Sequence, residues 1–407
     1  MTASLLPPPP SFRHGLANLM ASLAGARGHA GLPCPPLPEL PPADLAPARH
    51  LVLLVADGVG EAQLRAHLPG GLLDRARIAT LESVFPSTTA SAVGTFLTGL
   101  PPGQHGLTGW HVWFSAIASQ LAVLPLARRG IRGPAPEAED WAQRLLDAPP
   151  LADRLPCPME IVSPAWIVDS PFNRRLSGRA KRTGYRALPE MFAAIETALR
   201  VPEPSYIYAY WPDFDSKAHD AGPDGPAAVA ALHELERELA AFLGRVQGTD
   251  ATLLVTADHG FIAAPAERLI DLGDAPELAA LLACPLSGER RAAYAHLKPG
   301  CREAFRAVIE ARYGHALWCV DSDNLLADGW FGPPPYHPDL RNRIGDLTLL
   351  LREDWTLRDR LPGEDDYRLA GMHGGVSTAE REVPLCRFDL SRFDLGAGAS
   401  PRSAPGR

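Results

Sequence analysis

Short apolar runs that end in a glycine, a proline or an aspartate recur along this chain, and stretches of helical periodicity separate them. Apolar runs of this kind, rich in branched side chains, are typical of strands buried on both faces. Apolar positions three and four residues apart, with polar residues between them, are typical of amphipathic helices. The strand pattern covers 50–60, 155–171, 205–215 and 251–260, and the helical pattern covers 89–100, 188–200 and 224–246.

This alternation predicts an α/β fold with three α/β/α layers and a mainly parallel central sheet. After residue 260 the pattern changes to a mixture of short helices, strands and turns, which we interpret as an inserted α+β cap with its own small sheet. The expected parts are an extended, Pro-rich leader (1–48), the α/β core (49–260 and 366–395), the cap insertion (261–365) and a disordered tail (396–407).

Composition narrows the class of protein. Hydrophobic residues make up 46% of the 407 residues and charged residues 21%, which is typical of a globular protein with a large core. The net charge is −8 and no long basic cluster occurs, which argues against a nucleic-acid duplex as partner. No apolar run reaches the roughly 18 residues of a membrane span, and the start of the chain lacks the pattern of a signal peptide. We therefore expect a cytoplasmic protein without a membrane partner.

Acidic and imidazole side chains gather where the predicted strands end. In a parallel α/β sheet, ligands bind at the carboxyl ends of the strands. Three carboxylates and three imidazoles there suit two divalent cations with nitrogen and oxygen ligands, and none of the six scattered cysteines is placed to take part. One such residue alone is more often a helix cap or a solvated turn, so the prediction depends on the whole set. The set is Asp57, Asp215, His219, Asp258, His259 and His373.

A two-metal site needs a nucleophile to act on a phosphoryl group. The stretch FPSTTASAVGTFLTG places three hydroxyls before a predicted helix, on Ser87, Thr88 and Thr89. A hydroxyl at this place can be ionised by a bound cation, and the N–H groups of a helix N-terminus can receive phosphate oxygens. Ser and Thr are also ordinary helix N-caps, and the pattern alone does not choose among the three.

Five motifs in this order resemble the alkaline phosphatase superfamily, and within it the type I phosphodiesterases and nucleotide pyrophosphatases. They are VADGVG, a hydroxyl before LTG, DSKAHDAGP, VTADHG and MHGGVSTAEREVP, which together span most of the chain. The resemblance implies two zinc sites, although nitrogen and oxygen ligands also accept Mn²⁺. One site would consist of Asp215, His219 and His373. The other would consist of Asp57, Asp258 and His259, with the nucleophile as a further ligand.

The resemblance also selects among the hydroxyls. In the family the nucleophile stands nine residues before the Thr of the Thr-Gly that ends the helix; that Thr is Thr98 here, which implies Thr89 as nucleophile and metal ligand. Two family features are missing. Ala92 stands where the eukaryotic-type pyrophosphatases have an Asn that helps to hold a phosphate oxygen, and Tyr210 stands where the classical alkaline phosphatases have a Glu for a third metal ion. The Cys-x-Pro-x-Arg frame of the sulfatases is absent as well.

The predicted function is that of a metal-dependent phosphodiesterase or nucleotide pyrophosphatase, which hydrolyses phosphodiester or phosphoanhydride bonds of a small molecule through a phospho-threonine intermediate. Two divalent cations, three carboxylates and a Thr alkoxide give a nearly neutral site, which suits the single negative charge of a diester. The alternatives are a phosphomonoesterase or phosphonate hydrolase of the same superfamily and, in another class, a non-catalytic binding protein that retains the fold. Trp110, Trp113 and Tyr336 are aromatic candidates for stacking on a nucleobase.

Overall fold

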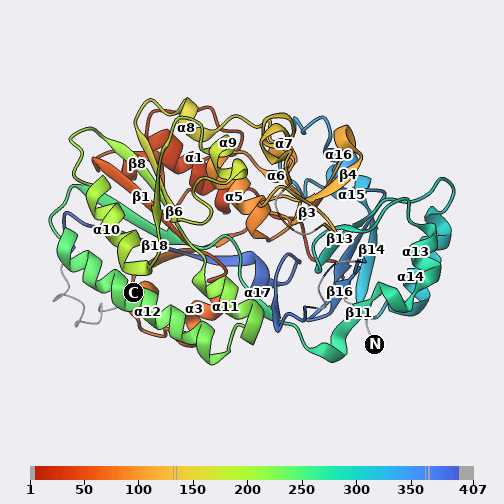
Figure 1. Cartoon of the computed structure of the whole chain (residues 1–407). Coiled ribbons are helices and arrows are strands. Elements are labelled where there is room, and N and C mark those ends of the chain that lie inside the picture. Colours follow the sequence, from red (N-terminus) through yellow and green to blue (C-terminus); the bar gives the residue numbers. More distant parts are fainter. Residues whose placement is uncertain (1–4, 132, 134, 363, 365–366, 394–407) are drawn as a thin grey trace, which may run out of the picture.

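Seven strands form the central sheet of the computed structural model (Figure 1). The structure describes residues 5–131, 133, 135–362, 364 and 367–393. In sheet order the strands are β2 (Arg77–Glu82), β18 (Glu382–Asp389), β9 (Ala251–Thr256), β1 (His50–Ala56), β8 (Ser205–Trp211), β6 (Met159–Pro164) and β7 (Lys181–Tyr185). The strands from β9 to β7 are parallel, and β18 runs antiparallel to both of its neighbours. The predicted mainly parallel sheet is confirmed.

The three middle strands are buried along their whole length. Every residue of β1 (HLVLLVA), β8 (SYIYAYW) and β9 (ATLLVT) is shielded from solvent, as expected for parallel strands covered on both faces. These strands also end in register, because Val55 lies opposite Tyr210 on one side and is paired with Thr256 on the other. The segments that follow the three strands therefore leave the sheet side by side, at the same edge.

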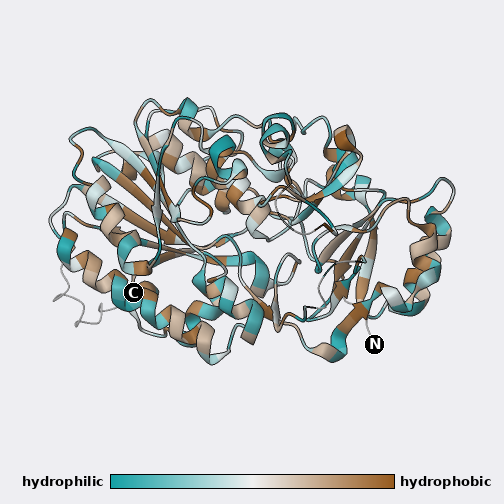
Figure 2. Ribbon diagram, viewed as in Figure 1, coloured by the Kyte–Doolittle hydropathy of each residue, from teal (hydrophilic) through white to brown (hydrophobic). Residues whose placement is uncertain are grey.

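Helices cover both faces of this sheet (Figure 1). α5 (Thr89–Thr98) lies on one face, and α10 (Leu188–Ala198) and α12 (Pro226–Val246) lie on the other. α12 is amphipathic, since its buried residues recur at steps of three and four. Figure 2 shows the same division over the molecule, with hydrophobic strands inside and hydrophilic residues on the outer sides of the helices. This is the three-layer arrangement that the sequence predicts.

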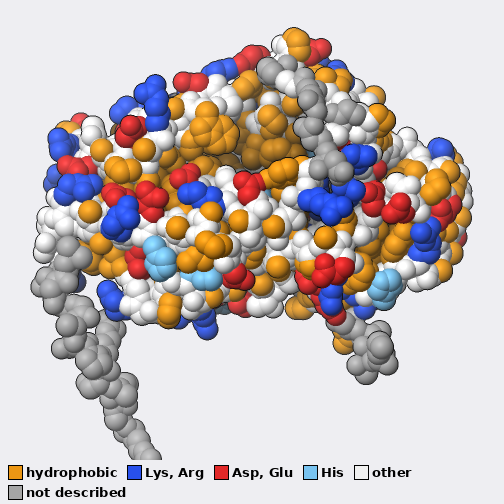
Figure 3. All heavy atoms as spheres, turned by 60° about the horizontal axis from the view of Figure 1, so that its bottom comes forward, with side chains coloured by type: hydrophobic (Ala, Val, Ile, Leu, Met, Phe, Trp, Pro, Cys, Tyr) orange, Lys and Arg blue, Asp and Glu red, His pale blue; other side chains and the backbone are white. Residues whose placement is uncertain are grey.

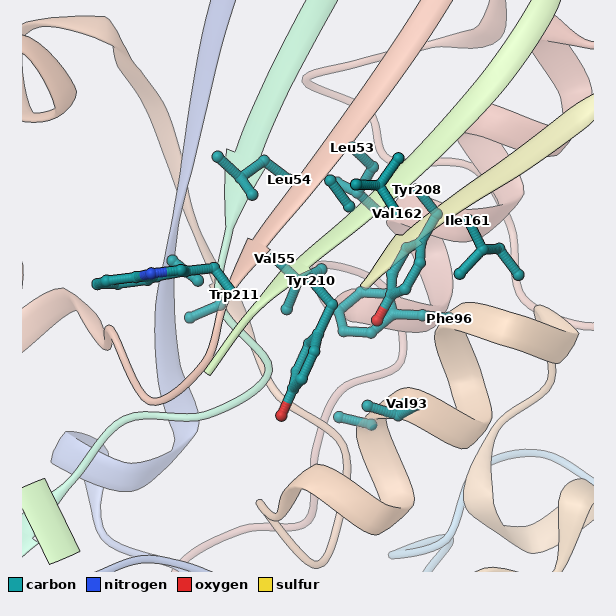
Figure 4. Close-up of a cluster of buried hydrophobic side chains, with 14 of the residues drawn as sticks. Leu53, Leu54, Val55, Val93, Phe96, Ile161, Val162, Tyr208, Tyr210 and Trp211 are labelled. Atoms are coloured by element: carbon teal, nitrogen blue, oxygen red, sulfur yellow. The ribbon is translucent and has the colours of Figure 1, made fainter. Parts of the chain in front are cut away.

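Alternate residues of β8 make the contact between α5 and the sheet. Figure 4 shows Tyr208 and Tyr210 on the side of Val93 and Phe96, which belong to α5, whereas Trp211 points to the other side. The rings of Phe96 and Tyr208 are 5.9 Å apart, centre to centre. Because successive side chains of a strand point to opposite faces, β8 brings Tyr210 to the face that α5 covers.

The first 48 residues differ from the extended leader that their proline content predicts. They contain α1 (Leu16–Ala26), whose residues 16–24 are all buried and which packs against α5. The Asn18 side chain fixes its start, because it accepts the N–H of Gly15 (3.0 Å) and donates to the carbonyls of Phe12 and Pro35 (both 2.8 Å). The prolines flank the apolar stretch LANLMASLAGA, so the average composition of the segment hides a helix of the core.

A second seven-stranded sheet forms the cap, at the right of Figure 1. In sheet order its strands are β14 (Leu317–Asp321), β15 (Leu347–Leu351), β13 (Ala292–Ala295), β12 (Ser287–Gly288), β3 (His111–Phe114), β4 (Ser119–Ala122) and β5 (Ala127–Arg128). The cap is therefore larger than the predicted insertion, since β3 to β5 come from a segment that the sequence assigns to the core. The sequence does not reveal this, because strands of two to four residues show little periodicity. The pairing of His111 with Gly288 also joins positions far apart in sequence.

Short elements complete the described chain. None of the helices in the described ranges combines the length and the apolar composition that crossing a bilayer requires. The predicted tail, 396–407, lies outside the described residues.

The remaining strands form two small sheets, β10 (Ile262–Ala263) with β17 (Gly371–Met372) and β11 (Leu269–Asp271) with β16 (Thr356–Arg358). The remaining α-helices are α2 (Pro42–Leu45), α3 (Glu61–His67), α4 (Leu72–Ala76), α6 (Pro102–His105), α7 (Ala138–Leu145), α8 (Leu151–Arg154), α9 (Pro171–Ser177), α11 (Asp213–Ala221), α13 (Pro276–Leu281), α14 (Arg302–Tyr313), α15 (Ser322–Ala327), α16 (Leu340–Arg343) and α17 (Thr378–Arg381).

The burial of α1 leads to a test by paired leucine substitutions. Leu19 in α1 is fully buried, whereas Leu5 in the same N-terminal segment is 89% exposed. We expect Leu19→Ala to lower the free energy of unfolding by about 2–5 kcal/mol, because it leaves a cavity in the core. Leu5→Ala should change it by no more than about 0.5 kcal/mol. Urea unfolding of both variants measures the difference, and equal small effects would contradict the packing of α1 against the core.

Candidate metal centre

The six aspartate and histidine residues expected to bind metal ions lie together at the edge where the middle strands end. They form two groups, and within each group the potential ligand atoms all lie within 4.8 Å of one another. The groups are adjacent, since His259 Nε2 of the first lies 4.0 Å from Asp215 Oδ1 of the second. The first group, which is fully buried, is Asp57, Asp258 and His259, and the second, which is partly buried, is Asp215, His219 and His373.

The turn after β9 explains why an acid and an imidazole stand next to each other in the sequence. The strand ends two residues before Asp258, so Asp258 and His259 lie in the turn and face the same space, with Oδ2 and Nε2 3.5 Å apart. The other oxygen of Asp258 accepts the N–H groups of Gly58 (3.1 Å) and His259 (3.0 Å). A Cβ on Gly260 would collide with the backbone carbonyl of Ala379, so this turn needs a glycine to pack against the core.

The second group is assembled from a helix and a small sheet. β8 ends at Trp211, and Asp215 lies in the first turn of α11, with His219 one turn later and 3.3 Å from it (Nε2 to Oδ1). This corrects the expectation that Asp215 ends the strand: the four-residue step to His219 is the spacing of neighbours on one helix face. His373 follows β17, which pairs with β10 and does not belong to the central sheet.

The three histidines share one orientation. In each, Nδ1 lies within hydrogen-bond distance of a backbone carbonyl oxygen, while Nε2 faces the cluster. When Nδ1 donates its proton to a carbonyl, Nε2 is unprotonated and available to a metal ion, which is the usual support of a metal-binding histidine. The pairs are His219 with Gly371 (3.0 Å), His259 with Gly260 (3.0 Å) and His373 with Ser87 (3.3 Å).

Burial and mutual repulsion shift the pKa values of these groups. Burial raises the pKa of Asp57 and of Asp258 well above the ordinary range, and the negative charges of Asp215 and Asp57, respectively, add to the effect. Burial opposes the protonation of His219, but the charge of Asp215 raises its pKa to about 9. Asp215 Oδ1 and Asp258 Oδ2 are buried without a hydrogen-bond partner among the described residues. Crowded carboxylates that lack donors fit the binding of cations, which would satisfy these oxygens.

Of the three neighbouring hydroxyls, Thr89 is the one that contacts this cluster. It is the first residue of α5, and its Oγ1 lies 3.1 Å from His259 Nε2 and 3.5 Å from Asp57 Oδ1. The hydroxyls of Ser87 and Thr88 donate to other groups, at 2.9 Å and 2.7 Å. The geometry therefore favours Thr89 as the nucleophile, in agreement with the family spacing.

Tyr210 and Glu289 also belong to the site. The hydroxyl of Tyr210 donates to Asp57 Oδ2. Glu289 comes from the turn between β12 and β13 in the cap, and its Oε1 accepts the hydroxyl of Thr88 (2.7 Å) and the N–H of Trp110 (2.6 Å). Burial raises the pKa of Glu289 to about 7. The sequence gives no sign of this role for Glu289, because the stretch SGERR has the composition of an ordinary solvated turn.

A cavity of about 1010 Å³ opens above both groups and Thr89. Val93, Leu97 and Ile161 line it from the core, and Glu289 and Arg290 line it from the cap. Figure 3 shows a face of the molecule that is hollowed, with hydrophobic side chains in the visible walls of the hollow. The volume is at the upper end of the range for small-molecule sites, roughly 300–1,000 Å³. A substrate with a sizeable apolar part can therefore reach the cluster.

One of the three aromatic candidates lines this cavity. Trp110 is 39% exposed and belongs to the cavity wall. Trp113 instead packs beside His296, with ring centres 5.8 Å apart, and Tyr336 donates its hydroxyl to the carbonyl of Leu326 (2.9 Å). The structure thus places neither Trp113 nor Tyr336 where it could stack on a substrate.

Comparisons with known proteins agree with this geometry. The profile of the family described as type I phosphodiesterase / nucleotide pyrophosphatase matches residues 51–123 and 133–376. Solved structures with a similar fold include human ectonucleotide pyrophosphatase / phosphodiesterase 5 (18% identity over 83% of this chain and 87% of that chain, TM-score 0.62). They also include the murine protein of that name (17%, 82% and 87%, TM-score 0.57) and phosphonoacetate hydrolase from Sinorhizobium meliloti, in complex with phosphonoacetate (20%, 84% and 90%, TM-score 0.58). No curated protein sequence matches.

The unpaired charge in the first group leads to a prediction about stability. The pKa of Asp258 is raised by folding, so its ionised carboxylate destabilises the metal-free protein once the pH has risen above the ordinary range of the group. Asp258→Asn removes the charge, and its amide oxygen can accept the same two backbone N–H groups. We expect the metal-free variant at pH 8 to be more stable than metal-free wild type by about 1–3 kcal/mol. Added Zn²⁺ should then stabilise the wild type far more than the variant.

Urea unfolding with chelator, and then with Zn²⁺, measures both effects. Asp140→Asn, on the surface of α7, is the control and should change neither quantity. A variant that is less stable than wild type without metal at pH 8, and equal to it near pH 4, would contradict the electrostatic account.

Proposed function

The chain belongs to the type I phosphodiesterase / nucleotide pyrophosphatase family and is a hydrolase of phosphoric esters. We propose that it cleaves a diester or anhydride bond of a small molecule through a phospho-threonine formed on Thr89. The observation that carries this proposal is the position of Thr89 Oγ1, at the floor of the cavity, 3.1 Å from His259 and 3.5 Å from Asp57. A nucleophile must lie beside the group that activates it and be open to substrate, and Thr89 meets both conditions.

Two divalent cations complete the site in this proposal. Asp57, Asp258 and His259 would hold one, with Thr89 as a further ligand. The second would be bound by Asp215, His219 and His373. The orphaned carboxylate oxygens and the Nε2 atoms that face the cluster suit Zn²⁺, and Mn²⁺ is the alternative. When bound, the cations lower the pKa of the Thr89 hydroxyl and neutralise charge on the phosphoryl oxygens.

The remaining parts of the mechanism belong to the chain itself. Thr89 Oγ1 attacks phosphorus, the leaving group departs on the opposite side, and water then cleaves the phospho-threonine. The carbonyls behind the three histidines hold Nε2 toward the cluster, and Tyr210 holds Asp57 through its hydroxyl. Val93, Leu97 and Ile161 make part of the cavity wall apolar, which lowers the polarity near the cluster and strengthens electrostatic interactions there. The hydrogen bonds to the histidines and to Asp57 are formed before the chemical step, and they fix the positions of the groups around Thr89.

A diester fits the charge of this site better than a monoester. Asp57, Asp215, Asp258 and the Thr89 alkoxide together offset the charge of two divalent cations, so a single negative charge on the substrate is enough. A phosphomonoesterase or a phosphonate hydrolase remains the alternative within the superfamily. The non-catalytic alternative is weakened because all six candidate ligands and the hydroxyl are present and close together.

Chelation tests the whole proposal on one preparation. We expect hydrolysis of bis-p-nitrophenyl phosphate to exceed that of p-nitrophenyl phosphate, to be lost with chelator and to return with Zn²⁺ or Mn²⁺, because the Thr89 hydroxyl hardly ionises without a cation. Metal analysis of the same preparation should give two ions per chain. Turnover that persists at full rate in the chelated, metal-free protein would refute the proposal.

Substitution of the neighbouring threonines tests the nucleophile. Thr89→Ala should lower kcat by roughly a thousandfold or more, as expected for the loss of a reacting group. Thr88→Ala is the matched control, since its hydroxyl bonds to Glu289, and should keep kcat within about tenfold. Both variants should bind two metal ions. An active Thr89→Ala beside an inactive Thr88→Ala would show that the nucleophile is misassigned.

A further inference from the structure

The turn between β12 and β13 is fixed rigidly against the core. Gly288 has φ +86°, and the N–H of Glu289 donates to the carbonyl of Ala292 (2.8 Å), which closes the turn. Two residues later, Arg291 forms a fully buried, two-pronged ion pair with Glu380, at 3.0 Å and 2.8 Å. The position of Glu289 is therefore fixed by the hydrogen bond that closes the turn and by the ion pair between Arg291 and Glu380.

From this turn the Glu289 side chain reaches across to the residue before the proposed nucleophile. A single oxygen, Oε1, accepts both the hydroxyl of Thr88 (2.7 Å) and the N–H of Trp110 (2.6 Å). The second oxygen, Oε2, has no hydrogen-bond partner in the described parts of the chain, and Glu289 lines the cavity. No ion pair joins Glu289 to a basic side chain among the described residues. A carboxyl group with one uncommitted oxygen thus lies in the wall of the cavity that also holds Thr89.

We propose that Glu289 is a specificity-determining residue, which makes the site select phosphoryl groups with one negative charge and reject those with two. The inference rests on the proposed function and extends it to the substrate class. A fixed carboxylate repels a phosphomonoester more than a diester, because the monoester carries the additional charge, and water screens this repulsion less inside a cavity than in bulk solvent. Ala92, on α5, provides no polar group that could compensate. The selection between monoesters and diesters thus comes from a residue of the cap, and the motifs of the core do not predict it.

Glu289→Gln isolates the charge. The amide oxygen of Gln can accept the same two hydrogen bonds from Thr88 and Trp110, so the positions of both should be kept. Glu303→Gln, on the exposed side of α14 in the same cap, is the matched control. The probes are p-nitrophenyl phosphate and methyl p-nitrophenyl phosphate, which share a leaving group and differ by one charge. The assay uses metal-loaded protein at pH 8.5, above the pKa of Glu289, which burial raises to about 7.

We expect the ratio of kcat/KM for the monoester to that for the diester to rise roughly tenfold in Glu289→Gln and to stay unchanged in Glu303→Gln. Inorganic phosphate, as a competitive inhibitor of diester hydrolysis, should bind Glu289→Gln more tightly by a similar factor. If Glu289→Gln does not fold, as judged by its thermal unfolding, Glu289→Ala tests the same ratio.

Two results would overturn the inference while leaving the proposed function intact. One is an unchanged ratio with diester turnover retained, and the other is an equal loss of both activities, which would indicate that Glu289 only positions Thr88. Failure of the proposed function gives a different result, since the wild type would then hydrolyse neither substrate with Zn²⁺ or Mn²⁺, and the inference would fall with it.

Discussion

The structure depends on negative charge that is buried where the middle strands of the sheet end. Asp57 and Asp258 are fully buried, and Asp215 lies beside them. In the described chain their ionic contacts are all to histidines, with no lysine or arginine within ion-pair distance. Buried carboxylates without a cationic partner are unfavourable, so folding alone leaves this region under electrostatic strain. Divalent cations would relieve this strain, and their binding would therefore stabilise the folded chain.

A second buried carboxylate, that of Glu380, is compensated by a basic side chain of the protein itself. Glu380 is also fully buried, but Arg291 pairs with it through two hydrogen bonds, and the N–H of Gly375 donates to it as well (2.8 Å). Although burial opposes its ionisation, Arg291 lowers the pKa of Glu380. A Cβ on Gly375 would lie 2.8 Å from the carboxylate, so this glycine, two residues after His373, is needed for the pair to form. This pair joins the cap turn to the loop behind His373, and through it the two sheets meet at the site.

The strand ends could be predicted because they leave a local signal. Continuous apolar runs that stop at an Asp or a Gly identify β1 and β9, and parallel strands in register bring the following residues together. The path of the chain at Asp215 could not be predicted in detail, because the stretch PDFD after the strand fits a turn as well as a helix. The helix α1 and the strands β3 to β5 were missed for other reasons: flanking prolines hide α1, whereas β3 to β5 are short and their stability comes from partners distant in sequence. Glu289 belongs to this class, since only the folded cap brings it to Thr88.

Three side chains around the site act in one direction. The side chain of Ala92 offers no donor to a phosphate oxygen. Tyr210 donates its hydroxyl to Asp57 and supplies no carboxylate for a third cation. Glu289 adds a carboxyl group on the cavity side. A site with fewer donors, no third cation and an added acid is poorly suited to a doubly charged phosphoryl group. Because the three side chains lie on different elements, their common effect on charge is a property of the assembled cavity, not of any one motif.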